Sequence, residues 1–410
     1  MKPEHALVVD LGSTKVTCLA ARPDKSDGIE VLAVETTPCK AMQRGSITDL
    51  DDAAKAIDAV VRRVAQAAPS DSTGALVLSI GGPNIQGAIG QGMKPIVPRG
   101  RHITHQDVLE VINHSRSVLP PSDWEQIQAL PREFRVDGSR DVHNALGMTG
   151  GKLEVETFIG TARVSAIQSL EKAVSMAGRK IDQFVPLPLA SGLGVLSQEE
   201  RDRGAVVVDI GGGLTSVAIF TRGSIAFSAS IPLGSRYVTN DLSNLLRTTF
   251  EEAERLKTVY GSALARLVPE RDSVDVLQAE QTVPRPMQRR VMCEIVESRM
   301  REIASLVAKQ IELSGFGSRP GEQLPTDLVL TGGGSLVPGT EKLFEETLQV
   351  SKARTVEPIP APGIPAAPGL AAAFGLARFA IECYDELAPA SGSQNWRDKV
   401  RSLFSLVTGS

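Results

Sequence analysis

The stretch VVVDIGGGLTSVAIF, residues 206–220, places three consecutive glycines between two runs of mostly β-branched and apolar residues. Asp209 lies near the end of the first run, and Thr215 and Ser216 open the second. Two such runs joined by a tight turn are typical of a β-hairpin. Glycine allows the backbone to approach a ligand closely, and successive N–H groups in such a turn form an anion site. The stretch therefore predicts a phosphate-binding hairpin.

The beginning of the chain repeats this pattern. In ALVVDLGSTKVTCLAA, residues 6–21, an apolar run ends near Asp10, a turn contains Gly12, and a second β run follows. Lys15 adds a positive charge beside the turn. Two copies separated by about 200 residues predict two similar domains that face each other.

Two opposed hairpins predict a clamp on a metal-bound triphosphate. We expect Asp10 and Asp209 to face Mg²⁺ or its water shell, because Mg²⁺ binds a few carboxylates and keeps several waters. We expect the phosphate donors to come from the two turns and the hydroxyls beside them: Gly12, Ser13, Thr14, Lys15, Gly211, Gly212, Gly213, Thr215 and Ser216. A single Asp- and Gly-containing turn can be purely structural. Two copies in matching contexts favour phosphate binding.

A third glycine cluster predicts the nucleoside part of the site. TDLVLTGGGSLVPGTEKLF, residues 326–344, is a strand, a turn with Gly332, Gly333 and Gly334, and the start of a helix. Upstream, TTFEEAERLKTVYG, residues 248–261, predicts a helix with Glu251, Glu254 and Lys257 near one face, where they can reach ribose and base. A solvated charged face remains the alternative for that helix.

The composition indicates an ordinary soluble protein. The net charge of −4 over 410 residues provides no basic field, so we expect no nucleic-acid partner. Four scattered cysteines with no CxxC pair favour free thiols over disulfides or zinc. The N-terminus has no signal-peptide core, and no apolar window approaches the roughly 18 residues of a transmembrane helix. A cytoplasmic protein is therefore expected.

The three glycine motifs resemble those of a known superfamily. Residues 10–15, 209–216 and 330–339 resemble the phosphate 1, phosphate 2 and adenosine motifs of the actin/chaperone/sugar-kinase ATPases. Within it the chain resembles the FtsA family of bacterial cell-division actin homologues. NALGMTGGKLEVETFIGTA (144–162) is similar to that family's Gly-Met-x-Gly stretch, and EEAERLKTVYG (251–261) to its Ala-Glu-x-x-Lys…Gly helix. The resemblance covers nearly the whole chain.

The resemblance implies an α/β, actin-like two-domain ATPase fold with a duplicated core, inserted subdomains and a C-terminal amphipathic helix. The implied divisions are a first core subdomain (1–82, 165–199 and 363–383), an inserted subdomain (83–164), a second core subdomain (200–238 and 312–362), a small subdomain over the nucleotide (239–311), a linker (384–394) and the terminal helix (395–410).

The resemblance also implies a function. Members of the family bind ATP and Mg²⁺ between the domains and polymerise head to tail on the cytoplasmic face of the inner membrane. They anchor FtsZ there through its C-terminal tail, which contacts the small subdomain, and recruit other division proteins. Leu187 precedes Pro188 where hydrolysing relatives often have a water-orienting Glu, so weak ATP hydrolysis is expected.

The C-terminal sequence predicts a membrane tether. Residues 384–394 form a polar Pro-, Gly- and Ser-containing linker. In residues 395–410 the apolar side chains share one helical face, and basic residues flank it; the expected membrane contacts are Trp396, Arg397, Lys399, Val400, Arg401, Leu403, Phe404 and Val407. A terminal helix that docks on its own protein is the alternative.

Two other functions compete with this interpretation. A PilM-like pilus-assembly protein shares the fold and the inserted subdomain, but such chains usually stop soon after the last core helix. A small-molecule kinase of the same superfamily would need a substrate pocket with a general-base Asp, and no acid in a suitable loop stands out. The tail therefore favours the FtsA-like function.

Overall fold

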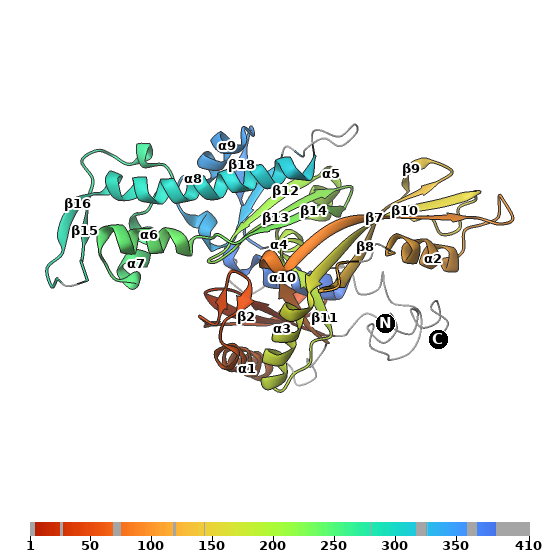
Figure 1. Cartoon of the computed structure of the whole chain (residues 1–410), viewed down its shortest axis with the longest axis horizontal. Helices are drawn as coiled ribbons and strands as arrows, with labels where there is room; N and C mark the ends of the chain where they lie inside the picture. The colour runs from red at the N-terminus through yellow and green to blue at the C-terminus, as the bar shows by residue number, and fades with distance from the viewer. Residues whose placement is uncertain are drawn as a thin grey trace.

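Two five-stranded sheets form the centre of the fold (Figure 1). The computed structural model describes residues 5–24, 28–68, 75–117, 120–142, 144–279, 281–316, 325, 327–358 and 367–382. The first sheet has the order β11-β6-β1-β2-β3, built from β1 (Ala6–Leu11), β2 (Lys15–Pro23), β3 (Ile29–Pro38), β6 (Ala75–Ile80) and β11 (Gln183–Pro186). The second has the order β14-β13-β12-β17-β18, built from β12 (Ala205–Ile210), β13 (Thr215–Thr221), β14 (Ser224–Ile231), β17 (Leu328–Thr331) and β18 (Ala353–Thr355).

The two sheets have the same topology. In each, three consecutive strands form an antiparallel meander, β1-β2-β3 or β12-β13-β14. Two further strands add in parallel beside the first strand of the meander, β6 and β11 in one sheet, β17 and β18 in the other. The duplicated α/β core that the repeated hairpin motif predicts is confirmed.

Two helices, α4 (Leu187–Val195) and α10 (Ala371–Glu382), lie between the sheets. Side chains alternate along a strand, so Val8 of β1 and Val207 of β12 both face this middle layer. The helices cross closely at Gly194 and Gly375, where an added Cβ would overlap the backbone carbonyl of Ala371 or Ala190. Glycine is therefore required at this crossing.

Other helices cover the outer faces of the sheets. On the first sheet lie α1 (Leu50–Ala67) and α3 (Val164–Met176), which pack against apolar residues such as Val9. On the second lie α6 (Arg236–Leu246), α8 (Arg289–Ser314) and α9 (Thr340–Leu348). We call the first sheet with α1 and α3 the first lobe, and the second sheet with α6, α8 and α9 the second lobe.

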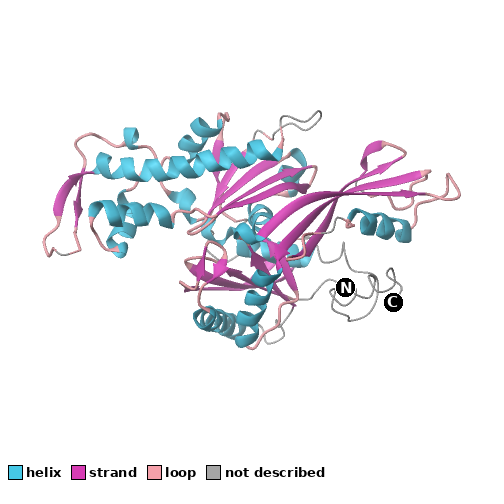
Figure 2. Cartoon of the chain, viewed as in Figure 1, coloured by secondary structure: helices cyan, strands magenta, loops and turns pink. Residues whose placement is uncertain are grey.

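Two smaller parts extend from opposite ends of the molecule (Figures 1 and 2). One is an antiparallel sheet of order β7-β10-β8-β9, with β7 (Ile85–Pro95), β8 (Trp124–Val136), β9 (Ser139–Val142), β10 (Lys152–Arg163) and helix α2 (His105–Ser115). The other combines α7 (Phe250–Tyr260), β15 (Ser273–Val276) and β16 (Arg285–Gln288). The remaining elements are short: β4 (Met42–Gln43), β5 (Ser46–Ile47), α5 (Gln198–Arg203), and the 3-10 turns η1 (Gly82–Asn84), η2 (Ala265–Leu267), η3 (Gly333–Leu336) and η4 (Pro368–Leu370).

The predicted linker and amphipathic helix, residues 384–410, lie outside the described residues. In the described part of the chain, α10 is the last helix and ends at Glu382. A search of the described helices finds none that combines the length and the apolar character needed to cross a bilayer.

Candidate functional site

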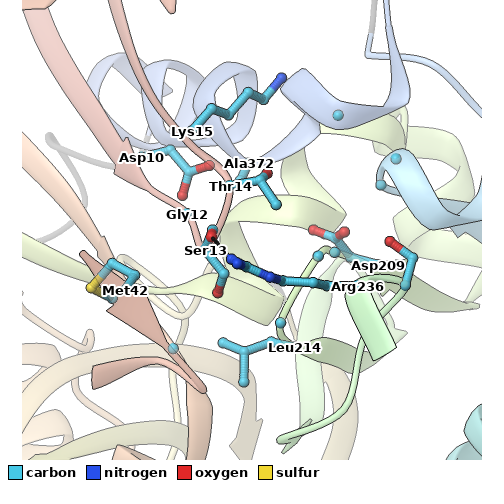
Figure 3. A pocket seen from close by; sticks show the side chains of 18 of the residues that line it. Asp10, Gly12, Ser13, Thr14, Lys15, Met42, Asp209, Leu214, Arg236 and Ala372 are labelled. Carbon is cyan, nitrogen blue, oxygen red and sulfur yellow. Dashed lines mark hydrogen bonds between the residues drawn. The ribbon is translucent and has the colours of Figure 1, made fainter. Parts of the chain in front are cut away.

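A cavity of about 670 Å³ lies between the two lobes (Figure 3). Its walls come from the β1–β2 turn of the first lobe, the β12–β13 turn of the second lobe, α7, and the 3-10 turns η3 and η4. Ligand pockets for small molecules and cofactors typically have volumes of roughly 300–1,000 Å³. The cavity therefore has room for a nucleotide.

The two hairpin turns have the same internal hydrogen bond. In the first, the Gly12 amide donates to the Lys15 carbonyl at 3.0 Å, and in the second the Gly211 amide donates to the Leu214 carbonyl at 2.9 Å. The repeated sequence pattern thus gives a repeated backbone structure.

The turns face each other and almost touch. A Cβ at Gly213 would overlap the Ser13 hydroxyl, and a Cβ at Gly212 would lie 2.6 Å from Thr14 Cγ2. Glycine at 212 and 213 therefore allows the two lobes to bring their turns together.

Asp10 and Asp209 lie on the cavity wall at equivalent positions of β1 and β12. Each carboxylate accepts a hydrogen bond from a serine: Ser79 donates to Asp10 at 2.7 Å, and Ser191 donates to Asp209. Burial raises the pKa of Asp10 above its ordinary value. Burial, together with the neighbouring Asp10 charge, raises the pKa of Asp209 to about 6.

Lys15 shares this electrostatic environment. Burial lowers the pKa of its ammonium group, and the charges of Asp10 and Asp209 act in the opposite direction. Two desolvated carboxylates next to one lysine leave negative charge that a cation would stabilise.

The side chains at this point of the cavity suit a Mg²⁺ ion that also binds a phosphate. Among the described residues no group of three or more His, Cys, Asp or Glu side chains converges, so the protein alone offers the ion two carboxylates at this point. Mg²⁺ commonly takes its other oxygens from water and substrate phosphates. The Ser216 hydroxyl, on the cavity wall, is buried and has no hydrogen-bond partner among the residues that the structure describes, so it is available to a ligand.

The third glycine cluster forms another wall. Gly332 has a φ of 80°, and a Cβ there would overlap the Asp209 carboxylate, so this position requires glycine. Gly333 lines the cavity, and no atom of the described residues lies within 4 Å of a Cβ added there. Gly334 is turned away and packs against Ile210 and Ser235. Two of the three glycines thus line the cavity.

Helix α7 contributes two of its three predicted residues. Glu254 and Lys257 line the cavity, and the buried Lys257 ammonium donates to Glu254 at 2.8 Å and to Thr239 at 2.9 Å. Glu251 is exposed in the first turn of the helix and does not reach the wall. Thr215 also does not line the cavity; it points to the opposite side of β13 from Ser216, and its hydroxyl donates to the Leu233 carbonyl at 2.8 Å.

Sequence reasoning missed several residues that line the cavity, and also Ser191, which lies behind Asp209 and does not line it. Ser79 and Ser191 are separated from their aspartates by 69 and 18 positions, and no local pattern marks them. Arg236 and Phe250 line the cavity from the first positions of α6 and α7. The available signal was weak: Arg236 opens the helix that follows β14, and Phe250 opens the helix that carries the Ala-Glu-x-x-Lys motif. Leu187 does line the cavity, and it supplies no polar atom there.

Several solved structures have the same fold. A PilM-PilN type IV pilus biogenesis complex has a TM-score of 0.62 at 16% identity, covering 92% of this chain and 98% of that chain. A MamK double helical filament has a TM-score of 0.53 at 14% identity, covering 94% and 99%. MreB5 of Spiroplasma citri bound to ADP gives 0.53 at 14% identity, covering 92% and 96%. At these identities the likeness shows the actin-like fold alone.

Sequence comparisons define the family. The model of the cell division protein FtsA matches residues 206–375, and that of the SHS2 domain inserted in FtsA matches residues 82–161. The FtsA of Pseudomonas aeruginosa is 32% identical over 82% of this chain and 79% of its own length. The FtsA of Rhizobium meliloti is 30% identical over 92% and 87%, and that of Escherichia coli K12 is 28% identical over 82% and 80%. The chain therefore belongs to the FtsA family of cell division proteins, with the actin-like fold.

Proposed function

We propose that this protein binds ATP with Mg²⁺ in the cavity between its lobes. The observation that carries the proposal is the pair of hairpin turns with identical internal hydrogen bonds, which face each other across a cavity that holds two desolvated aspartates. Backbone amides at glycine turns bind anions. With one turn on each wall, a polyphosphate in the cavity would accept hydrogen bonds from both sides.

Each wall has its own part in this proposal. The turns at residues 12–15 and 211–216 hold the phosphates, with Lys15 neutralising charge, and Asp10 and Asp209 hold the Mg²⁺ through its water shell. Mg²⁺ held by these two aspartates would neutralise negative charge on the phosphates. Gly332 and Gly333 lie against the nucleoside, and Glu254 and Lys257 contact ribose and base. Gly334 and Thr215 support the adjacent backbone, and Glu251 takes no part in nucleotide binding.

Hydrolysis of the bound ATP is slow in this proposal. Acceleration of phosphoryl transfer to water depends on a group that orients the attacking water. Leu187 lies on the cavity wall without a polar atom. ATP therefore acts mainly as a structural switch that joins the two lobes and favours assembly.

The cellular role follows from family membership and from the C-terminal sequence. We propose that the protein polymerises on the cytoplasmic face of the inner membrane at the division site, attached as a peripheral protein by the helix at 395–410. There it anchors FtsZ through the FtsZ tail, which binds the small subdomain at 239–311, and recruits later division proteins. The support for this role is family membership and the amphipathic sequence at 395–410. In this proposal, ATP binding in the cavity controls the assembly.

Titration calorimetry with ATP and Mg²⁺ tests the nucleotide site. Gly333→Phe should abolish measurable ATP binding, because the added ring would extend into the cavity. Gly28→Phe is the matched control, since a Cβ at Gly28 likewise meets nothing within 4 Å and Gly28 is not part of the cavity wall. Equal affinity of the Gly333→Phe variant and the wild type would refute the site.

A further inference from the structure

The side chain of Arg236 reaches across the cavity from one lobe to the other (Figure 3). Arg236 is the first residue of α6 in the second lobe, and its Nη1 donates to the Ser13 carbonyl in the turn of the first lobe at 3.4 Å. Its guanidinium carbon lies 5.1 Å from the centroid of the Phe250 ring, which also lines the cavity. This side chain is thus the point where the two lobes meet at the phosphate turns.

The backbone of Arg236 is fixed to the phosphate turn of its own lobe. The Ser235 amide donates to the Gly211 carbonyl at 2.9 Å, and the Arg236 amide donates to the Gly212 carbonyl at 2.8 Å. A Cβ at Gly234 would lie 2.5 Å from the Gly211 oxygen, so the approach to the turn depends on glycine there. Any ligand held by that turn will therefore lie next to the Arg236 side chain.

The charge of Arg236 is poorly balanced compared with its cationic neighbours. Lys257 is paired with Glu254, and the charges of Asp10 and Asp209 act on the Lys15 ammonium. Lys40 is exposed at the cavity rim. In the part of the chain that the structure describes, Arg236 has no carboxylate within ion-pair distance, and its single hydrogen bond to Ser13 is long.

A guanidinium has five N–H donors in a planar fork. Arg236 lines the cavity, and among the described residues its guanidinium makes only one long bond to a carbonyl and the contact with Phe250, so most of these donors are available to a ligand. An arginine guanidinium can donate two parallel hydrogen bonds to two oxygens of one phosphate. These charge-assisted bonds are shorter and stronger than a bond to a neutral carbonyl. A phosphate at the turns is therefore a better acceptor for Arg236 than the Ser13 carbonyl.

We infer that Arg236 binds the phosphate chain of the nucleotide and exchanges its contact with Ser13 for phosphate oxygens. The inference rests on the proposed nucleotide site and adds to it a side chain that distinguishes phosphorylated from unphosphorylated ligands. Phe250 positions the guanidinium by stacking, while adenosine itself binds the walls formed by Gly333, Glu254 and Lys257.

The test compares ATP, ADP and adenosine as ligands in titration calorimetry, each with Mg²⁺. Arg236→Gln removes the charge and leaves a shorter polar side chain, and Arg236→Lys keeps the charge without the fork. Since hydrogen bonds to charged groups are strong, Arg236→Gln should weaken ATP and ADP binding about 10- to 100-fold and leave adenosine within about twofold. Arg236→Lys should recover part of the loss. Arg62→Gln, an exposed arginine on α1 whose ion pair is with Asp58, is the control.

The outcomes separate this inference from the proposed function. A wild-type protein that binds neither ATP nor ADP would overturn both. A wild type that binds ATP, with Arg236→Gln unchanged, would overturn the inference alone. An equal loss of ATP and adenosine in a folded Arg236→Gln protein, as judged by its melting temperature, would show a general structural role and would also overturn it.

Discussion

Arg44 of the first lobe donates a hydrogen bond from Nε to the hydroxyl of Tyr237 on α6 at 2.6 Å. Its guanidinium carbon also lies 5.6 Å from the centroid of the same ring. Arg44 occupies the turn between β4 and β5, next to Gly45 on the cavity wall, and Tyr237 follows Arg236 directly. The two contacts from adjacent α6 residues, to Arg44 and to Ser13, therefore join the lobes beside the cavity.

We expect Arg44→Ala to speed nucleotide release without much loss of stability. The pair is partly exposed, so its contribution to the free energy of unfolding should be below about 1 kcal/mol. Opening of the lobes should nevertheless become easier, and the dissociation rate of a fluorescent ATP analogue, measured by stopped flow, should rise about 2- to 5-fold, as a loss of up to ~1 kcal/mol implies. Tyr237→Phe keeps the ring and removes the hydroxyl, so its effect should be smaller. An unchanged dissociation rate in Arg44→Ala would contradict a role in closure.

Asp209 should destabilise the nucleotide-free protein at neutral pH. Its pKa in the folded protein, about 6, lies above the ordinary value of 3.8. The folded state therefore favours the protonated carboxyl, and the stability from this group is present below about pH 4 and is lost as pH rises through 6. Two pKa units correspond to about 2.7 kcal/mol, and because Asp209 keeps some solvent contact we expect roughly 1–2 kcal/mol.

Asp209→Asn tests this prediction. In the absence of nucleotide and Mg²⁺, the variant should unfold at a higher denaturant concentration than the wild type at pH 7.5, and the difference should shrink near pH 5. The same substitution should weaken Mg²⁺-dependent ATP binding. A variant less stable than the wild type at pH 7.5 would show that the Asp209 charge is already compensated in the empty cavity.

Glu133 should hold the β7-β10-β8-β9 sheet, here called the inserted sheet, against the second lobe. It lies on β8 with 4% of its side chain exposed, and it accepts from Arg135 at 3.0 Å and from Arg222 at 3.4 Å. Arg222 belongs to the turn between β13 and β14, so the pair crosses from the inserted sheet to the second lobe. Loss of the Glu133 charge would leave Arg135 paired with Glu156 alone and remove one acceptor of Arg222, and breaking a buried ion pair is destabilising.

We expect Glu133→Gln to lower the free energy of unfolding by about 2 kcal/mol, less than for a fully buried pair because Arg222 is partly exposed. Glu125→Gln, at an exposed position of the same strand, should change it by less than about 0.5 kcal/mol. Urea denaturation of both variants gives the comparison. A Glu133→Gln protein as stable as the control would mean that the contact contributes no net stability.

The sequence predicted the repeated part of the fold well, because each copy carries its own local signal. The Asp-Gly turns at 10–12 and 209–211 impose the hairpin and its register, and both appear as expected. Contacts that join segments far apart in the chain carry no such signal. Ser79, Ser191 and Arg236 reach the site through the packing of different elements, and no pattern around them reveals the partner.

The other predictions that failed concerned the direction in which a side chain points. Thr215 and Ser216 are adjacent hydroxyls in the sequence, but strand alternation sends only Ser216 to the cavity. Glu251 and Glu254 are one helical turn apart, yet Glu254 lines the cavity together with Phe250 and Lys257, while Glu251 is exposed to solvent. The packing of α7 on its neighbours decides which of its side chains turn towards the cavity.

The C-terminal sequence should bind the protein to anionic membranes. If residues 395–410 form a helix, Trp396, Phe404 and the other apolar residues lie on one side, and Arg397, Lys399 and Arg401 flank it. Each basic residue near an anionic leaflet contributes about 1 kcal/mol, so three add roughly 3 kcal/mol to the apolar burial. One such helix binds reversibly, and a polymer that presents many of them binds far more firmly.

Sedimentation with liposomes that contain anionic lipid measures this attachment. The full-length protein should pellet with the liposomes, and a chain truncated after Gly392 should stay in the supernatant while it still binds ATP. The double variant Trp396→Glu/Phe404→Glu should behave like the truncated chain. The matched control is Ser402→Glu/Ser405→Glu, which adds the same two negative charges on the opposite side of the predicted helix and should still pellet. If the truncated chain sediments as well as the full-length protein, the membrane contact lies elsewhere; if both double variants fail equally, net charge rather than the apolar face decides binding.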